Sequence, residues 1–345
     1  MISVRGLEKR YGSVTAVDGV SFDVEAGEVF GLVGPNGAGK TSTLKMLCGL
    51  VDPSAGTIEV NGFDAGDPEM RRALGFLPEE SPLYDEMSPR SYLRFFADLY
   101  DVDRAAATER IDAALDRLDL DARDRPVGDF SKGMKRKVAI ARSLVNDPDV
   151  LVYDEPASGL DPVTTNSVLA FTRELRETGK TVVFSAHNLY HVESVCDRVV
   201  VMNEGRIVAR GSVDGIRERH GETTYRVFTD VEPTATPALA DLDAATAEVG
   251  DRYRTTVPDM DAVAAVREAV ADAGGEVVDI RSREPSLEDV FLDIVGRPMP
   301  GRFTGDIGDD ADGDEDDGAD RESDGGGDGD EGAETAAATA TEATE

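Results

Sequence analysis

Eight consecutive residues near the N-terminus have the types and spacing needed to hold a triphosphate. They follow the pattern G-x-x-x-x-G-K-T, and the candidate site comprises Gly34, Pro35, Asn36, Gly37, Ala38, Gly39, Lys40 and Thr41, followed by Ser42. Glycines let backbone N–H groups approach phosphate oxygens, the lysine supplies a positive charge for the β- and γ-phosphates, and the threonine hydroxyl can ligate Mg²⁺. An ordinary glycine turn that happens to precede a Lys-Thr pair would show the same sequence pattern. The flanking sequence must therefore distinguish such a turn from a triphosphate site.

The residues on both sides of this loop predict the structure that such a site requires. Residues 28–33 form a short apolar run typical of a buried strand, and residues 42–50 carry leucines at helical spacing. A strand that turns through glycines into a helix directs N–H groups and the positive end of the helix dipole at one point. The sequence therefore predicts a nucleoside triphosphate site, but this loop alone does not indicate which class of nucleotide-dependent protein contains it.

Two later apolar runs end in residues that could act on a phosphate. Residues 150–153 predict a buried strand followed by Asp154 and Glu155, and residues 181–186 predict another followed by His187. Ligands of open parallel sheets bind at the carboxyl ends of the strands. Beside a phosphate loop, the first carboxylate is expected to hold Mg²⁺ and the second to polarise the attacking water. A lone histidine is more often a structural group. Only the position of His187 at the carboxyl end of a predicted strand favours a functional role.

A Ser-x-Gly sequence, Ser131 to Gly133, opens a predicted long helix whose first turns are basic. The four cations are Lys132, Lys135, Arg136 and Lys137. A simple N-cap role would explain the serine but not the cations, which are unfavourable near the positive end of a helix dipole. An anion bound at this helix end would make them favourable, so a second anion site is an open alternative.

Two further candidates have equally ordinary explanations. Tyr11 precedes the phosphate loop and could stack on a flat base, or it could be an edge-strand aromatic that packs on its neighbours. Glu79 follows the short predicted strand at residues 74–78, where a carboxylate could serve a site or belong to a solvated acidic turn. The residues by themselves leave both alternatives open.

Taken in order, these features resemble the nucleotide-binding subunit of an ABC transporter over about residues 2–220. The resemblance implies that ATP is the nucleotide and that Tyr11 stacks on its adenine. It also implies that Thr41 and Asp154 share Mg²⁺, with Glu79 as a further possible ligand.

The resemblance assigns the chemical step to residues at the strand ends and in the phosphate loop. Lys40 holds the phosphates, Glu155 is the general base, and His187 senses the γ-phosphate. A complete set of this kind implies an active ATPase.

The resemblance also implies a homodimer and shows two departures from the family pattern. Ser131 and Gly133 are implied to bind the γ-phosphate of ATP held by a second copy, and Asp161 to communicate across the dimer. Lys132 stands where the family usually has glycine, and Glu79 stands where it usually has glutamine. Both changes are similar to those in the branch that pairs with exporter-type permeases.

The predicted fold class is α/β: a P-loop NTPase domain of the ABC ATPase type with a mixed sheet at residues 1–220. A helical subdomain is expected at about residues 85–145. Residues 221–300 predict a small α+β accessory domain, and residues 285–292 resemble the C-terminal extension of exporter-type ABC ATPases. Residues 301–345 are acidic and almost free of apolar side chains, and they are expected to be disordered.

The chain is strongly acidic, with 70 Asp and Glu against 36 Lys and Arg and a net charge of −34. Residues 301–345 contain 17 acidic and two basic residues and contribute −15, so the first 300 residues carry −19. Such a field opposes binding to nucleic acid and to anionic membrane surfaces. The chain has only 7 Lys beside 29 Arg, and this acidic, Lys-poor composition resembles that of halophilic proteins. An ordinary acidic protein is the alternative.

The cysteines and the hydropathy pattern predict where the chain works. Cys48 and Cys196 lie in apolar stretches, which favours core packing in a reducing compartment over metal or disulfide roles. The sequence shows no signal peptide and no apolar run of about 18 residues. We therefore expect a soluble chain that reaches the cytoplasmic face of the cell membrane through a separate integral membrane permease.

The predicted function is to power transport, with export implied by the resemblance. ATP binding would join two copies and hydrolysis would release them, while the permease converts this motion. An alternative is a soluble ABC-type ATPase that clamps ribosomes or DNA, but the single cassette, the lack of a coiled-coil insert and the acidic surface disfavour it. A catalytically silent nucleotide switch is disfavoured by the presence of Glu155 and His187.

Overall fold

The computed structural model describes most of the chain: residues 1–220, 223–233, 244–283, 286–288 and 290–291. The acidic segment predicted to be disordered lies outside the described residues.

Apolar runs with no polar alternation form the inner strands of the central sheet, because strands covered on both faces have no solvent side. The strands are β3 (Val29–Val33), β6 (Leu74–Leu77), β7 (Val150–Tyr153), β8 (Thr181–Ala186), β9 (Arg198–Asn203) and β10 (Arg206–Ser212). The six-stranded sheet has the order β10-β9-β3-β8-β7-β6, and every residue of β3, β7 and β8 is buried. These three strands run in parallel, whereas β10 is antiparallel to β9. The carboxyl ends of β3, β7 and β8 therefore meet at one edge, as the sequence predicted.

A second, antiparallel sheet of four strands has the order β2-β1-β4-β5. Its strands are β1 (Ile2–Tyr11), β2 (Val14–Val24), β4 (Ala55–Val60) and β5 (Phe63–Asp64). Register shifts after Val4, Leu7 and Lys9 break the apolar alternation that marks a strand, so the full lengths of β1 and β2 are not evident from the sequence.

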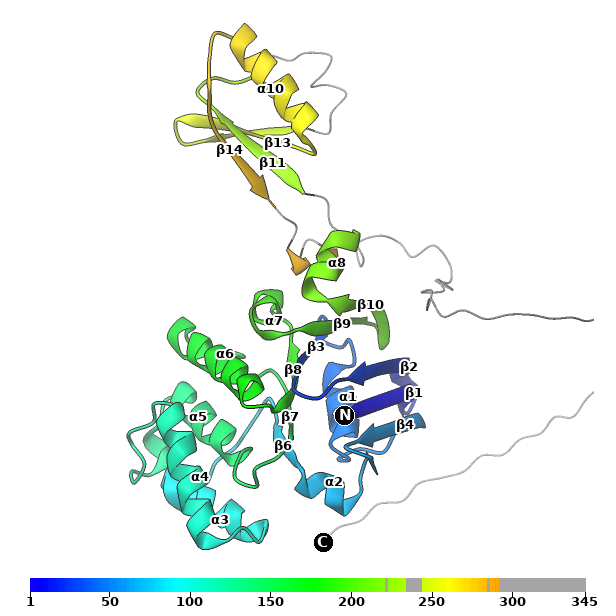
Figure 1. Cartoon of the computed structure of the whole chain (residues 1–345), viewed down its shortest axis with the longest axis vertical. Helices are drawn as coiled ribbons and strands as arrows, with labels where there is room; N and C mark the ends of the chain where they lie inside the picture. Colours follow the sequence, from blue (N-terminus) through cyan, green and yellow to red (C-terminus); the bar gives the residue numbers. More distant parts are fainter. Residues whose placement is uncertain (221–222, 234–243, 284–285, 289, 292–345) are drawn as a thin grey trace, which may run out of the picture. The chain divides into compact units, whose positions relative to one another are not determined.

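The helices cover the central sheet and form a separate group beside it. They are α1 (Lys40–Leu47), α2 (Pro68–Arg72), α3 (Pro89–Leu99), α4 (Arg104–Arg117), α5 (Lys132–Arg142), α6 (Pro162–Glu177), α7 (Leu189–Val195) and α8 (Val213–His220). Helices α3, α4 and α5 contact one another on the side of α6, within the segment predicted to be helical (Figure 1). In the described part of the chain, no helix is both long and apolar enough to cross a membrane.

A third sheet lies beyond α8 in the sequence and is antiparallel, with the order β12-β13-β11-β14. Its elements are β11 (Thr224–Thr229), β12 (Ala245–Val249), β13 (Arg252–Val257), α10 (Met260–Asp272) and β14 (Val277–Arg283). Valines of α10 pack on one face of this sheet around Val227 and Val257. The exposed residues of β12 lack the apolar alternation of a half-buried strand, so the sequence pattern does not reveal this strand.

After the third sheet, the chain returns to the hydrophobic core beside the central sheet. Leu287 and Val290 are buried in the same cluster as Val195 and Ile216, at the end of α7 and on α8. The backbone N–H of Leu287 donates to the carboxylate of Glu193 on α7. The chain is therefore held in place shortly before its acidic segment begins.

Candidate functional site

The phosphate loop is shaped by close backbone packing at two glycines. Gly34 has φ +153°, and a Cβ there would lie 2.2 Å from the carbonyl oxygen of Met202. Gly39 has φ +100°, and a Cβ there would lie 2.4 Å from the carbonyl oxygen of Ala16. Helix α1 follows at once, beginning at Lys40 instead of the predicted residue 42, and Gly39 offers no side-chain cap. The first N–H groups of α1 thus remain available to an anion.

Lys40 lies folded over this loop and is buried. Its Nζ donates to the carbonyl oxygens of Gly34, at 2.8 Å, and Pro35, at 3.3 Å. The same Nζ is 3.6 Å from Oε1 of Glu155. One charge therefore connects the loop to the carboxylate at the end of β7.

Asp154 is bound by two hydroxyl groups at the edge where the strands end. Thr41 Oγ1 donates to Asp154 Oδ1 at 3.3 Å, and Ser185 Oγ donates to the same oxygen at 2.6 Å. Ser185 Oγ also accepts from the N–H of Glu155 at 2.9 Å. Ser185 was not among the residues predicted from the sequence, although a serine within the apolar run of β8 was the available signal.

Glu155 and His187 form a contact at the rim of the site. His187 Nδ1 lies 2.8 Å from Glu155 Oε2, with Glu155 buried and the His187 side chain half exposed. Glu155 has φ +49°, an uncommon conformation for glutamate that the surrounding hydrogen bonds maintain. Both residues line a depression of about 470 Å³ together with His191, whose pKa is lowered by burial and by the nearby His187. A carboxylate held in this way can accept a proton from a water molecule in the depression.

Gly133 and Asp161 both lie against Thr164, and Ser131, two residues before Gly133, completes a second group at these helix ends. Ser131 is the exposed N-cap of α5 and accepts from the N–H of Met134 at 3.2 Å. A Cβ at Gly133 would lie 2.8 Å from Thr164 Oγ1, so the helix ends meet closely only because this residue is glycine. Asp161 accepts from Thr164 N at 2.9 Å and Oγ1 at 2.6 Å, and the hydroxyl contact is the main cause of its lowered pKa.

Two of the cations in the first turns of α5 have partners within the chain. Lys135 pairs with Asp85 at 3.2 Å, and Arg136 is fully engaged by backbone carbonyls. These two cations therefore have partners other than the incoming anion that the sequence left as an open alternative. The partners come from segments distant in sequence, so the local pattern did not reveal them.

Arg136 connects α5 to the ends of two strands. Its Nε donates to Pro156 O at 2.8 Å, Nη1 to Pro78 O at 2.8 Å, and Nη2 to Glu155 O at 2.5 Å. Burial lowers the pKa of Arg136, and the negative charge of Glu79 is the largest opposing influence. The sequence alone does not indicate this role for Arg136. Its contacts fix the backbone of Glu155, which makes it a positioning residue.

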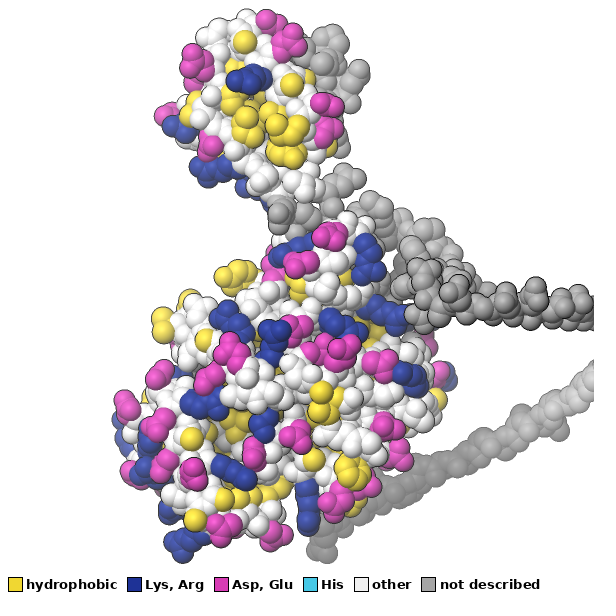
Figure 2. Space-filling view, viewed as in Figure 1, with side chains coloured by type: hydrophobic (Ala, Val, Ile, Leu, Met, Phe, Trp, Pro, Cys, Tyr) yellow, Lys and Arg dark blue, Asp and Glu magenta, His cyan; other side chains and the backbone are white. Residues whose placement is uncertain are grey.

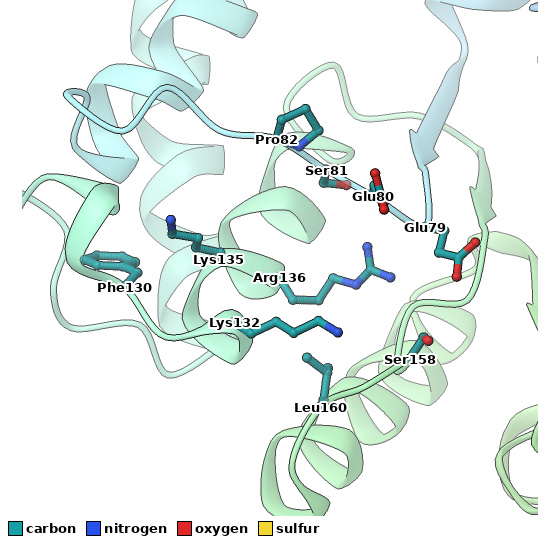
Figure 3. Close-up of a pocket in the computed structure, with 10 residues that line it drawn as sticks. All are labelled: Glu79, Glu80, Ser81, Pro82, Phe130, Lys132, Lys135, Arg136, Ser158 and Leu160. Atoms are coloured by element: carbon teal, nitrogen blue, oxygen red, sulfur yellow. The ribbon is translucent and has the colours of Figure 1, made fainter.

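Glu79 lies in a groove of about 640 Å³ beside this arginine. Figure 3 shows Lys132 and Arg136 reaching from α5 toward Glu79 and Ser158. Glu79, which follows β6, therefore lines the same groove as these cations of α5. A role of Glu79 as a ligand of Mg²⁺ stays a prediction.

Tyr11 lies at the end of β1 and is 47% exposed. The Nζ of Lys9 is 5.1 Å from the centre of its ring. Part of the Tyr11 side chain is therefore open to a base arriving from solvent, and stacking on adenine stays a prediction.

We expect Arg136→Gln to lower kcat by roughly 10- to 100-fold, because the amide cannot satisfy three buried carbonyls at once. The Kd for ATP should change by less than about twofold, since no contact of the phosphate loop is removed. Steady-state ATPase assays and nucleotide titrations measure the two quantities, and the pH profile of kcat reports whether Glu155 is displaced.

Lys137→Gln is the matched control, since it removes the next positive charge on α5. Arg136→Lys keeps the positive charge but lacks the planar guanidinium group that reaches three carbonyls. It should therefore behave like Arg136→Gln. Equal losses in Arg136→Gln and Lys137→Gln, or a fully active Arg136→Lys, would contradict the positioning role.

Comparison with known proteins agrees with this geometry. Residues 17–158 match the family model described as ABC transporter, and residues 211–295 match that of the ATP-binding protein DrrA1-3-like C-terminal domain. The chain is 36% identical to the Nod factor export ATP-binding protein I of Ralstonia nicotianae, over 87% of this chain and 95% of that protein. It belongs to the ABC transporter ATP-binding proteins.

Other relatives and solved structures extend this result. The chain is 36% identical to the daunorubicin resistance ATP-binding protein DrrA3 of Streptomyces coeruleorubidus, over 86% of this chain and 96% of that protein. An ATP-binding subunit of an ABC transporter superposes with a TM-score of 0.59 at 33% identity, over 64% of this chain and 92% of that one. The predicted fold class and ATPase activity are confirmed. The proposed salt adaptation, the domain boundaries and the individual site residues stay predictions.

Proposed function

We propose that this ABC ATPase powers export as a homodimer bound to a separate integral membrane permease. The names of its relatives support export, since they include a Nod factor export protein and a daunorubicin resistance protein. The observation that carries the proposal is the contact of Glu155 with both Lys40 and His187, because it joins a phosphate-binding charge to a candidate base.

The donor set beside the loop fits Mg²⁺. Thr41 and Asp154 present a hydroxyl and a carboxylate oxygen 3.3 Å apart, and Mg²⁺ usually takes few protein oxygens because phosphates and water fill its other positions. Bound there, Mg²⁺ would neutralise charge on the β- and γ-phosphates. Ser185 keeps the Asp154 carboxylate turned toward Thr41 through its own hydrogen bond.

The chain's own residues then prepare hydrolysis. Lys40 would exchange its loop carbonyls for phosphate oxygens, which releases Glu155 from its charge partner. Glu155 would accept the proton of the attacking water, and His187 would move from Glu155 toward the γ-phosphate. The conformation of Glu155 is held meanwhile through Ser185 and Arg136.

A second copy would complete each site. Ser131 is exposed at the start of α5, and its hydroxyl and the neighbouring N–H groups are suited to a γ-phosphate. Asp161 caps α6 on the same side through Thr164, so movement of one helix end alters the other. ATP would thereby hold two copies together until it is hydrolysed.

We expect the tagged chain to be recovered from its own host with the membrane fraction, together with a polytopic membrane protein. Reconstitution of that pair in liposomes should raise ATP turnover above that of the chain alone. In this proposal the chain lies at the cytoplasmic face of the membrane, where it is bound to the permease.

The alternative function predicts a different fractionation. Recovery with ribosomes or DNA, and no response of ATP turnover to the membrane protein, would favour a soluble clamp and contradict the exporter assignment.

A further inference from the structure

A second histidine lines the same depression as Glu155 and His187. It is His191, which lies on helix α7 shortly after His187, and its side chain is partly buried. Its backbone N–H donates to Asn188 O at 3.2 Å, and its carbonyl oxygen accepts from Ser194 Oγ at 2.8 Å. Within the described part of the chain, the imidazole ring itself has no hydrogen bond or ion pair. The ring is therefore available to a group inside the depression.

Glu155 is isolated in this depression as a negative charge. Acidic and basic side chains are interspersed over the larger part of the molecule (Figure 2). In contrast, Glu155 is the one acid among the described residues that line the depression. The other ionisable groups lining it are His187, His191 and Tyr190. A proton on His191 would therefore place a positive charge in the same depression as the Glu155 carboxylate.

The elements that pack against α7 bring no other charge into the depression. These elements are α6, β3 and β8; the two strands have no charged side chain, and the depression is lined by uncharged residues at the start of α6. Arg173 and Glu177 are exposed and lie toward the C-terminal end of α6. Other charges of α6 and α7 are paired, Glu193 with Arg217, Glu174 with Arg117 and Arg176 with Asp197. Glu155 and His187 are thus the charged groups that act on His191.

His191 carries a proton only in acid solution. Burial is the main cause that lowers the pKa of His191, the nearby His187 lowers it further, and Glu155 acts in the opposite direction. The resulting pKa lies below the ordinary histidine value of about 6.5. The ring is therefore neutral at neutral pH and gains a positive charge as the pH falls below that value.

In the proposed mechanism, ATP draws away both groups that contact the Glu155 carboxylate. Lys40 Nζ lies 3.6 Å from Glu155 Oε1, and His187 Nδ1 lies 2.8 Å from Oε2. Both then turn toward phosphate oxygens, so a protonated His191 is the cation that remains in the depression. Opposite charges attract strongly where burial limits water, and Glu155 would turn toward His191 and away from the attacking water. A neutral His191 exerts no such attraction.

We propose that His191 inhibits the ATPase when it is protonated, by pairing with the Glu155 carboxylate, and leaves Glu155 free when it is neutral. This inference rests on the proposed role of Glu155 as the general base. His191 does not take the proton of the attacking water, so it is a regulatory residue and not a catalytic residue. ATP turnover is thereby expected to fall in acid solution through protonation of His191.

The pH profile of ATP turnover tests this role in the full chain. Turnover at saturating ATP is measured between about pH 8 and about pH 5.5 at constant ionic strength, and each variant is compared with its own value at about pH 8. The unmodified chain should lose about tenfold over this range, whereas His191→Gln, which cannot gain the proton, should lose less than about threefold. His220→Gln removes the third histidine of the chain, on α8, and should keep the profile of the unmodified chain.

A permanent charge at the same position should reproduce the inhibited state. His191→Lys keeps a positive charge throughout the assay, so its turnover at about pH 8 should lie about tenfold below that of His191→Gln. The Kd for ATP and the unfolding temperature, measured for each variant at both ends of the pH range, separate this effect from weaker nucleotide binding or unfolding. An acid loss in His191→Gln equal to that of the unmodified chain, or full turnover of His191→Lys at about pH 8, would overturn the proposal.

Glu155→Gln separates this proposal from the assignment of the base. Rapid hydrolysis by Glu155→Gln would overturn both, because the carboxylate that His191 is proposed to capture would not be the base. If Glu155→Gln is inactive at every pH while the His191 variants keep the profile of the unmodified chain, only the regulatory role of His191 is wrong.

Discussion

Replacement of Glu155 by Gln should lower ATP turnover by about 10²- to 10⁴-fold while ATP still binds. The amide has nearly the same shape and can keep the contact with His187, but it cannot accept a proton from water. ATP affinity should not fall, because the change removes a negative charge that lies 3.6 Å from Lys40, beside the expected phosphates. With hydrolysis blocked, size-exclusion chromatography with light scattering should detect a dimer that forms with ATP and does not form with ADP.

Glu204→Gln is the matched control for this change. Glu204 also has a positive φ, +47°, and it lies exposed in the turn between β9 and β10. The control removes the same charge from a similar backbone conformation, so its turnover should match that of the unmodified chain. Rapid hydrolysis by Glu155→Gln would show that another group is the base. A monomer that binds ATP without turnover would contradict the shared site and leave the base assignment intact.

The main site could be predicted from sequence because its parts are local. The phosphate loop and Asp154-Glu155 each lie at the end of a short, fully apolar strand, and parallel strands bring such ends to one edge. Adjacent residues thus sufficed to predict Lys40, Thr41, Asp154 and Glu155 as neighbours. Their close contacts in the structure agree with that expectation.

The remaining features depend on contacts between segments that are distant in sequence. Arg136 looks like a surface cation on an amphipathic helix, and only the packed structure brings three carbonyls from two loops to its guanidinium. The positive φ of Glu155 has no sequence signal at all. The arrangement of the third sheet also depends on which strands pair and in what register, including β12, which the sequence pattern did not reveal.

Replacement of Lys40 by Ala should weaken ATP binding by roughly 100-fold, about 3 kcal/mol. Lys40 is buried, and its Nζ is held by Gly34 O and Pro35 O at the mouth of the loop, so phosphate oxygens can replace these carbonyls with little rearrangement. Alanine removes the charge and also leaves Glu155 without its nearby cation, which adds repulsion toward the triphosphate. Titration with a fluorescent ATP analogue, with unfolding temperature measured in parallel, tests this expectation.

Lys45→Ala distinguishes a local effect from a change in net charge. Lys45 lies on the same helix α1, only five residues away, but it is exposed and points away from the buried face formed by Leu44 and Met46. Charge attraction at that distance through water is screened, so ATP affinity should change by less than about twofold. Equal weakening by both variants would mean that the general field of an acidic protein controls binding. Unchanged ATP affinity in Lys40→Ala would contradict a role of Lys40 in phosphate binding, because its buried charge would then contribute nothing to the binding of the triphosphate.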